Sequence, residues 1–90
     1  MRLTKQQFDY LVSRGLRPFD HGRWWDEDNP AEQFAAACYA TNSVAELINF
    51  DTAPLADAQA DMEQWGITLD EWRQAQREAL ETAMYEYANA

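Results

Sequence analysis

The chain has 90 residues, the length of a single domain, and its 16 Asp and Glu residues against 7 Lys and Arg residues give a net charge of −9. Direct binding to nucleic acid or to an anionic membrane surface is not expected, because both rest on clusters of basic residues. One cysteine and one histidine are too few for an internal disulfide or for a metal cluster of cysteines and histidines.

The first predicted helix covers residues 5–14. Thr4 and Gln7 have the spacing of a capping box, in which each side chain bonds to the other residue's backbone N–H. Apolar residues follow at helical spacing, and Gly15 is suited to the left-handed conformation that ends many helices. The next segment, residues 16–29, contains a proline and a glycine and no helical period, which predicts a long ordered loop.

Four more helices are predicted from similar start signals. Asn29, Ser43 and Thr68 are each followed three positions later by Glu, and Pro54 fits the first turn of another helix. No alternating apolar pattern predicts a strand. The fold class is therefore all-α, a compact bundle of about five helices in one domain, residues 1–90. The predicted helices cover residues 5–14, 30–41, 44–50, 54–65 and 69–87.

Trp24 and Trp25 stand side by side in the predicted loop, in a short piece that reads as extended. Neighbouring side chains point in different directions, so both cannot point into one small core. We expect one to be buried and the other to lie on the surface, and the sequence leaves open which. The outer one is a candidate interface anchor, since Trp is enriched at binding hot spots.

The sequence contains no pattern that predicts catalysis. With His21 as the only histidine, neither a catalytic triad nor a paired-histidine metal motif can be assembled, and no glycine-rich phosphate loop is present. Cys38 lies on the apolar stripe of an alanine-rich helix and is expected to be a small buried residue. We predict a protein that is not an enzyme, and we assign no catalytic, cofactor-binding or metal-binding residue.

The start of the chain lacks the apolar core of a signal peptide, and no apolar run reaches the roughly 18 residues of a membrane span. We therefore expect a cytoplasmic protein that does not contact membranes.

The charge is unevenly distributed along the chain. Residues 1–25 carry five basic and two acidic residues (net +3), whereas residues 26–90 carry two basic and fourteen acidic residues (net −12). Asp57 and Asp61 stand one helical turn apart, where like charges destabilise a helix by a few tenths of a kcal/mol. The grouping of acidic residues in this part of the chain favours a role for them in binding a partner. The candidate partner-binding residues are Asp51, Asp57, Asp61, Glu63, Asp70, Glu71, Glu78, Glu81, Trp24 and Trp25.

Carboxylates repeated along rigid helices resemble a row of phosphates, and such a DNA mimic is attracted to basic nucleic-acid-binding surfaces. In size, acidity and lack of motifs the chain resembles the small phage proteins that act against host defence, such as anti-CRISPR and anti-restriction proteins. The resemblance is one of overall profile and is carried by no motif. It implies an inhibitor whose partner is a protein with a basic surface, in a defence or nucleic-acid-handling complex.

Three alternatives stay open at the level of sequence. The many aromatic residues and the alanine-rich helix are compatible with an adaptor that self-associates. The expected state is a monomer or a homodimer. Residues 62–76 have the outline of a helix-turn-helix, but the second helix begins with acids that would face phosphates. A third alternative is that the acidic residues only keep the protein soluble or adapt it to high salt.

Overall fold

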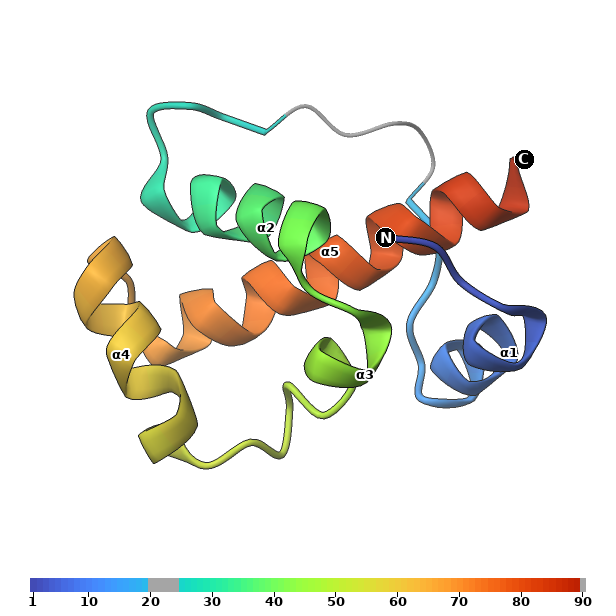
Figure 1. The fold of residues 1–90 in the computed structure, drawn as a ribbon, viewed down its shortest axis with the longest axis horizontal. Helices are drawn as coiled ribbons and strands as arrows, with labels where there is room; N and C mark the ends of the chain where they lie inside the picture. Colours follow the sequence, from blue (N-terminus) through green and yellow to red (C-terminus); the bar gives the residue numbers. More distant parts are fainter. Residues whose placement is uncertain (20–24, 90) are drawn as a thin grey trace.

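Capping side chains start most of the helices. Thr4, Ser43 and Thr68 each form a complete capping box with the third residue of their helix. Asn29 caps the second helix by accepting two backbone N–H groups of its first turn. The computed structural model (Figure 1) describes residues 1–19 and 25–89, in which the helices are α1 (Lys5–Ser13), α2 (Pro30–Thr41), α3 (Val44–Leu47), α4 (Leu55–Trp65) and α5 (Leu69–Ala88).

The predicted all-α fold with five helices is confirmed within the described residues, where no strand occurs. The bounds of α1, α2 and α5 agree with the prediction to within one residue. The predicted loop over residues 16–29 contains no helix in its described parts, 16–19 and 25–29. The rest of that loop, including Trp24 and most of the predicted extended piece, lies outside the described residues.

The prediction for residues 44–50 is too long, because α3 ends at Leu47. The backbone N–H of Phe50 bonds to the carbonyl of Leu47 at 3.1 Å, three residues back. That spacing belongs to a turn, since an α-helix bonds four residues back. Pro54 is likewise the cap of α4 and not part of its first turn, because its ψ of 154° is extended.

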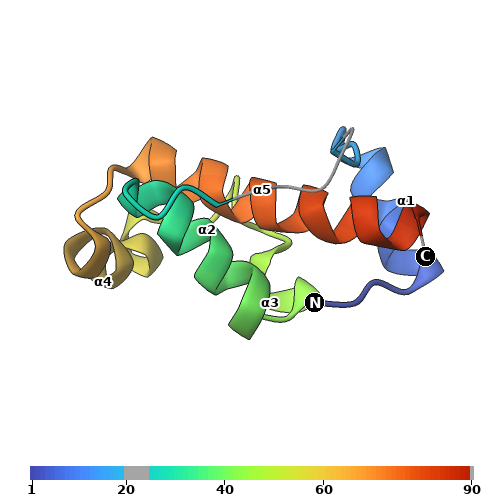
Figure 2. The same cartoon turned by 90° about the horizontal axis from the view of Figure 1, so that it is seen from above.

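The long helix α5 lies across the other helices (Figure 1, Figure 2). α2 packs along it, α4 lies at its N-terminal end, and α1 lies at the opposite end. Ala35 of α2 and Ala75 and Ala79 of α5 are fully or almost fully buried. Small side chains allow helices to approach closely, and α2 and α5 make the most extensive contact between helices in the described residues.

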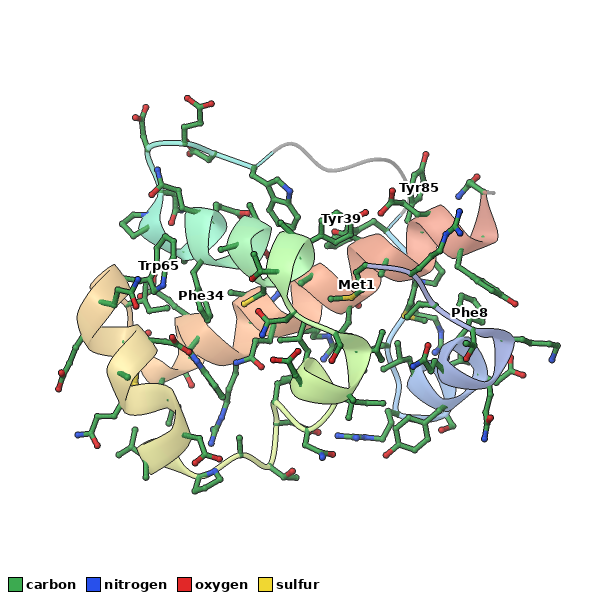
Figure 3. All side chains as sticks on the ribbon, viewed as in Figure 1. Met1, Phe8, Phe34, Tyr39, Trp65 and Tyr85 are labelled. Atoms are coloured by element: carbon green, nitrogen blue, oxygen red, sulfur yellow. The ribbon has the colours of Figure 1, made fainter. Side chains whose placement is uncertain are left out.

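Aromatic stacking attaches α1 to the far end of α5. The ring of Phe8 stacks on that of Tyr87 with 4.7 Å between their centroids, and Figure 3 shows Phe8 on α1 at that end of the molecule. Leu11 of α1 is almost fully buried and belongs to the hydrophobic core. The radius of gyration is 12.5 Å, close to the roughly 12 Å expected for a single compact domain of this length.

Candidate functional site

A groove of about 780 Å³ lies between α2, α3, the connection from α3 to α4, α4 and the first half of α5. Its volume is within the range of ligand-binding pockets, about 300–1,000 Å³. Aromatic and aliphatic side chains from all four helices line it. These are Phe34, Cys38, Leu47, Phe50, Trp65 and Trp72.

The charged residues that line the groove are all acidic. Glu46 of α3 and Asp57 and Asp61 of α4 contribute three carboxylates. None of the lining residues in the described part of the chain is lysine, arginine or histidine. A concave site with one sign of charge and apolar walls focuses its electric field, so the groove attracts cations.

Asp61 is held in place by the core. The indole Nε1 of Trp72 donates a hydrogen bond to Asp61 Oδ2 at 3.1 Å, and Trp72 itself is only 5% exposed. The other oxygen, Oδ1, has no hydrogen-bond donor among the described residues. One carboxylate oxygen of the groove is thus fixed by a buried tryptophan, while the other is available to a ligand.

Gln76 is the most unusual lining residue. The residue as a whole is 4% exposed, and it lies on α5 one turn after Trp72. Its amide is nevertheless not one of the fully buried, unpartnered side-chain groups of the described residues. Gln76 is therefore a polar residue of the groove wall and carries no burial cost of that kind.

Glu46 is held by the cap of α3. It accepts hydrogen bonds from the backbone N–H and the hydroxyl of Ser43, at 3.0 Å each, and from Asn42 Nδ2 at 3.1 Å. These bonds, the backbone one first, lower the pKa of the Glu46 carboxyl below its ordinary value. Glu46 therefore stays charged down to more acidic pH than a free glutamate.

Trp65 and Phe34 close the groove at the junction of α4 and α2. Their ring centroids are 5.7 Å apart with a tilt of 54°, and Figure 3 shows the two side chains beside each other there. Cys38 lies in the groove wall and is buried, as the sequence predicts. Burial raises the pKa of its thiol to about 12, so the thiol is neutral at physiological pH.

The predicted acidic residues do not all share one environment. Asp57 and Asp61 line the groove, whereas Asp51 and Glu81 are paired elsewhere. Asp51 forms an ion pair with Arg14. Glu81 lies 3.5 Å from Arg77 Nε, and its side chain is only 13% exposed. These two carboxylates are neutralised locally and contribute little to a negative surface.

The remaining predicted acids lie outside the groove. Glu63, Asp70 and Glu71 are exposed, and Glu71 belongs to the capping box of α5. Glu78 is half-buried and accepts a hydrogen bond from Gln74 Nε2 at 3.4 Å. Of the predicted acidic set, the groove therefore includes Asp57 and Asp61 only.

Trp25 is half-buried and packs against the hydrophobic core. Trp25 alone does not decide which of the two adjacent tryptophans is buried and which lies on the surface, so that expectation stays a prediction. Trp24 lies outside the described residues.

Of the residues that line the groove, only Asp57 and Asp61 were identified from the sequence, and Glu46 and Gln76 are two that were missed. Glu46 was recognised only as a capping residue, and nothing local indicates which cavity it borders. Gln76 left a signal in the sequence, because it interrupts the apolar stripe of α5 four residues after Trp72 and four before Leu80. A polar residue at such a core position deserves a structural explanation.

Within residues 1–19 and 25–89, no three side chains of the metal-binding types gather into a possible ion site. The described helices also lack the length and apolar character of a membrane-crossing segment. Comparison with protein-family models, curated proteins and solved structures found no match to this chain. Function is therefore inferred from the groove and from the charge of the molecule.

Proposed function

We propose that the protein acts without catalysis, by binding a protein partner at a basic surface that otherwise binds nucleic acid. The observation that carries the proposal is the groove, whose carboxylates Asp57, Asp61 and Glu46 are accompanied by no basic lining residue. Carboxylates placed around apolar walls can both attract a basic surface and bury part of it.

The charge of the rest of the chain supports the same function. Residues 26–90 contain two arginines against fourteen acids. Arg77 is already paired with Glu81, and Arg73 is half-buried. The excess negative charge is therefore largely uncompensated, which speeds encounter with a positively charged partner and makes binding sensitive to salt.

An inhibitor of a defence or nucleic-acid-handling complex fits this description best. It shares its size, acidity and absence of motifs with anti-CRISPR and anti-restriction proteins. By covering the basic surface, the protein keeps nucleic acid away from it. A helix-turn-helix role is less well supported, because Asp70 and Glu71 are exposed in the first turn of α5, where a recognition helix meets the phosphates.

The test is capture of nucleic-acid-binding proteins by the immobilised chain. The probe is the fraction of a cell lysate that a DNA-affinity matrix retains, applied at low ionic strength. We expect captured protein to be released by added duplex DNA and by raised salt. The double variant Asp57→Asn/Asp61→Asn is expected to lose about tenfold or more of the captured protein, because charge-assisted contacts at the groove are removed.

A matched control removes the same charge elsewhere. Glu27→Gln/Glu86→Gln neutralises two exposed carboxylates that do not line the groove, and we expect it to retain most of the capture. The proposal is contradicted if the bound protein resists duplex DNA and salt, if nothing is captured, or if the two double variants lose capture equally.

A further inference from the structure

We propose that residues 1–19 form a clip that opens as one unit, releases one wall of the groove, and leaves the contact between α2 and α5 intact. The clip consists of α1 and the non-helical residues on either side of it. Opening is a property of the free chain and needs no partner, so it is tested apart from the proposed function.

α1 has little of the packing that holds the longer helices. Its one buried residue is Leu11, whereas eight residues of α5 are buried. Among the described helices none packs extensively against α1, which lies at the end of the molecule (Figure 1, Figure 2). Regions with few buried apolar side chains open at a lower free energy than the core.

Three of the polar bonds between the clip and the rest of the chain are long. Arg77 Nη2 donates to the carbonyl of Gly15 at 3.4 Å. The backbone N–H groups of Arg17 and Phe19 donate to the side chain and the carbonyl of Glu81, also at 3.4 Å. The usual range is about 2.7–3.2 Å, so these three bonds add little resistance to opening.

Charge attraction helps to keep the clip closed. The clip contains four basic residues and one acid, a net charge of +3, whereas residues 26–90 carry a net charge of −12. Its ion pair with the rest of the chain joins Arg14 to Asp51, whose side chains are 23% and 48% exposed. Salt screens the attraction between exposed charges, so raised salt favours the open clip.

The clip opens as a whole because α1 cannot persist alone. α1 has nine residues, and an isolated helix shorter than about 12–15 residues is marginal in water. Once Phe8 leaves the ring of Tyr87 and Leu11 leaves the core, α1 loses the packing that keeps it helical. Its backbone hydrogen bonds are therefore lost together.

Opening reaches the groove through Arg14. Its guanidinium pairs with Asp51 and donates to the carbonyl of Ile48 at 3.2 Å, and so holds the end of α3 and the connection to α4. Asn49 and Phe50 lie between these two contacts in the chain and line the groove. The closed clip thus braces one wall of the groove, and opening releases that wall.

Amide hydrogen exchange of the full chain, followed by NMR, measures the opening residue by residue. The amides of Arg14 and Leu16 are bonded within the clip, and that of Phe19 is bonded to α5. We expect these three to exchange through one shared opening, with protection at least about tenfold lower than that of Ala79 and Leu80 in the core. Raising NaCl from about 0.02 to 0.5 M should increase their exchange about two- to fivefold.

Two matched variants test the role of charge. Asp51→Asn removes the ion pair, so it should increase exchange in the clip about two- to fivefold at low salt and reduce the effect of added salt. Glu63→Gln removes an exposed carboxylate of α4 and is the control. It should change exchange in the clip by less than about twofold.

A third variant separates opening of the clip from unfolding of the whole chain. Phe34→Leu weakens the contact with Trp65, away from the clip, and should lower the protection of Ala79 and Leu80 about tenfold. Because the clip opens while that contact is intact, exchange of Arg14 in this variant should stay as in the natural chain.

The proposal is overturned if clip and core amides are equally protected, or if Phe34→Leu speeds exchange in both by the same factor. Either result means that the clip opens only when the whole chain unfolds. An equal effect of Asp51→Asn and Glu63→Gln also overturns it. The amide of Phe50, bonded to the carbonyl of Leu47, should follow the clip in its response to salt. If it follows Leu80 instead, the link between clip and groove is wrong.

Discussion

Arg14 ties the end of α1 to the connection between α3 and α4. Its guanidinium pairs with the carboxylate of Asp51, donates to the carbonyl of Ile48 at 3.2 Å, and lies 5.7 Å from the centre of the Tyr10 ring. The hydrogen bond from Arg14 is the main cause that lowers the pKa of Asp51 below its ordinary value. The same pair raises the pKa of Arg14.

The ion pair between Arg14 and Asp51 predicts how the stability of the fold depends on pH. Because the pKa of Asp51 is lower in the folded chain than in the unfolded one, its charge stabilises the fold above the unfolded value of about 3.9. That contribution is lost as the pH falls through the lowered pKa. We expect Asp51→Asn to be less stable than the natural chain at neutral pH and to differ from it little in strong acid.

The measurement is the free energy of unfolding in urea for both chains, at neutral pH and well below the pKa of free aspartate. Asp57→Asn is the control, because it removes an exposed carboxylate that forms no ion pair with the described residues, and it should show no such convergence. A difference between Asp51→Asn and the natural chain that is constant with pH would show that the ion pair adds nothing.

At the scale of elements, the corner between α4 and α5 sets the geometry of the groove. Gly66 caps the end of α4 with a left-handed φ of +65°, and the N–H of Ile67 bonds back to the carbonyl of Met62 at 3.1 Å. Ile67 is buried, and Thr68 then begins α5 with its capping box. Asp61 and Gln76 lie on either side of this corner.

We expect Gly66→Ala to destabilise the fold by about 1–2 kcal/mol, because a side chain makes the left-handed conformation unfavourable. A Cβ atom at this position meets no atom within 4 Å, so the cost is one of backbone conformation alone. Gly66→Asn should cost less, since asparagine adopts this conformation more readily. Thermal and urea unfolding check both, and an alanine variant as stable as the natural chain contradicts the assignment.

Local signals in the sequence predicted the elements well. The capping residues Thr4, Ser43 and Thr68 act within three residues of themselves, so their roles could be seen before the fold was known. The predicted helix bounds were wrong where a turn replaces the last part of a helix. This happens after Leu47, where α3 ends earlier than predicted. What the sequence could not show is which distant groups meet.

The acidic residues illustrate that limit. Asp51 and Asp57 look equivalent in the sequence, yet one pairs with Arg14, 37 positions earlier, and the other lines the groove. The pairing depends on how α1 packs, which no local pattern encodes. Of the predicted acidic residues, Asp57 and Asp61 therefore share the groove, whereas Asp51 and Glu81 form ion pairs outside it.

At the scale of the whole molecule, the described surface favours a monomer. The large hydrophobic residues exposed there are Tyr10 and Leu55, at 44% and 52%. They lie on α1 and at the start of α4, and two isolated residues are a normal surface feature. With a net charge of −9, copies of the chain also repel one another.

We therefore expect a monomer over a wide range of concentration. Sedimentation equilibrium at low and at moderate ionic strength is the measurement, because screening would reveal any association that repulsion hides. A dimer that persists at low protein concentration contradicts this expectation, and it would revive the alternative of a self-associating adaptor.

The stack of Phe8 on Tyr87 joins the first helix of the chain to the last one. A ribosome that synthesises this chain must therefore complete α5 before α1 has its aromatic partner. The two ends of the sequence reach their final packing together, at the close of translation.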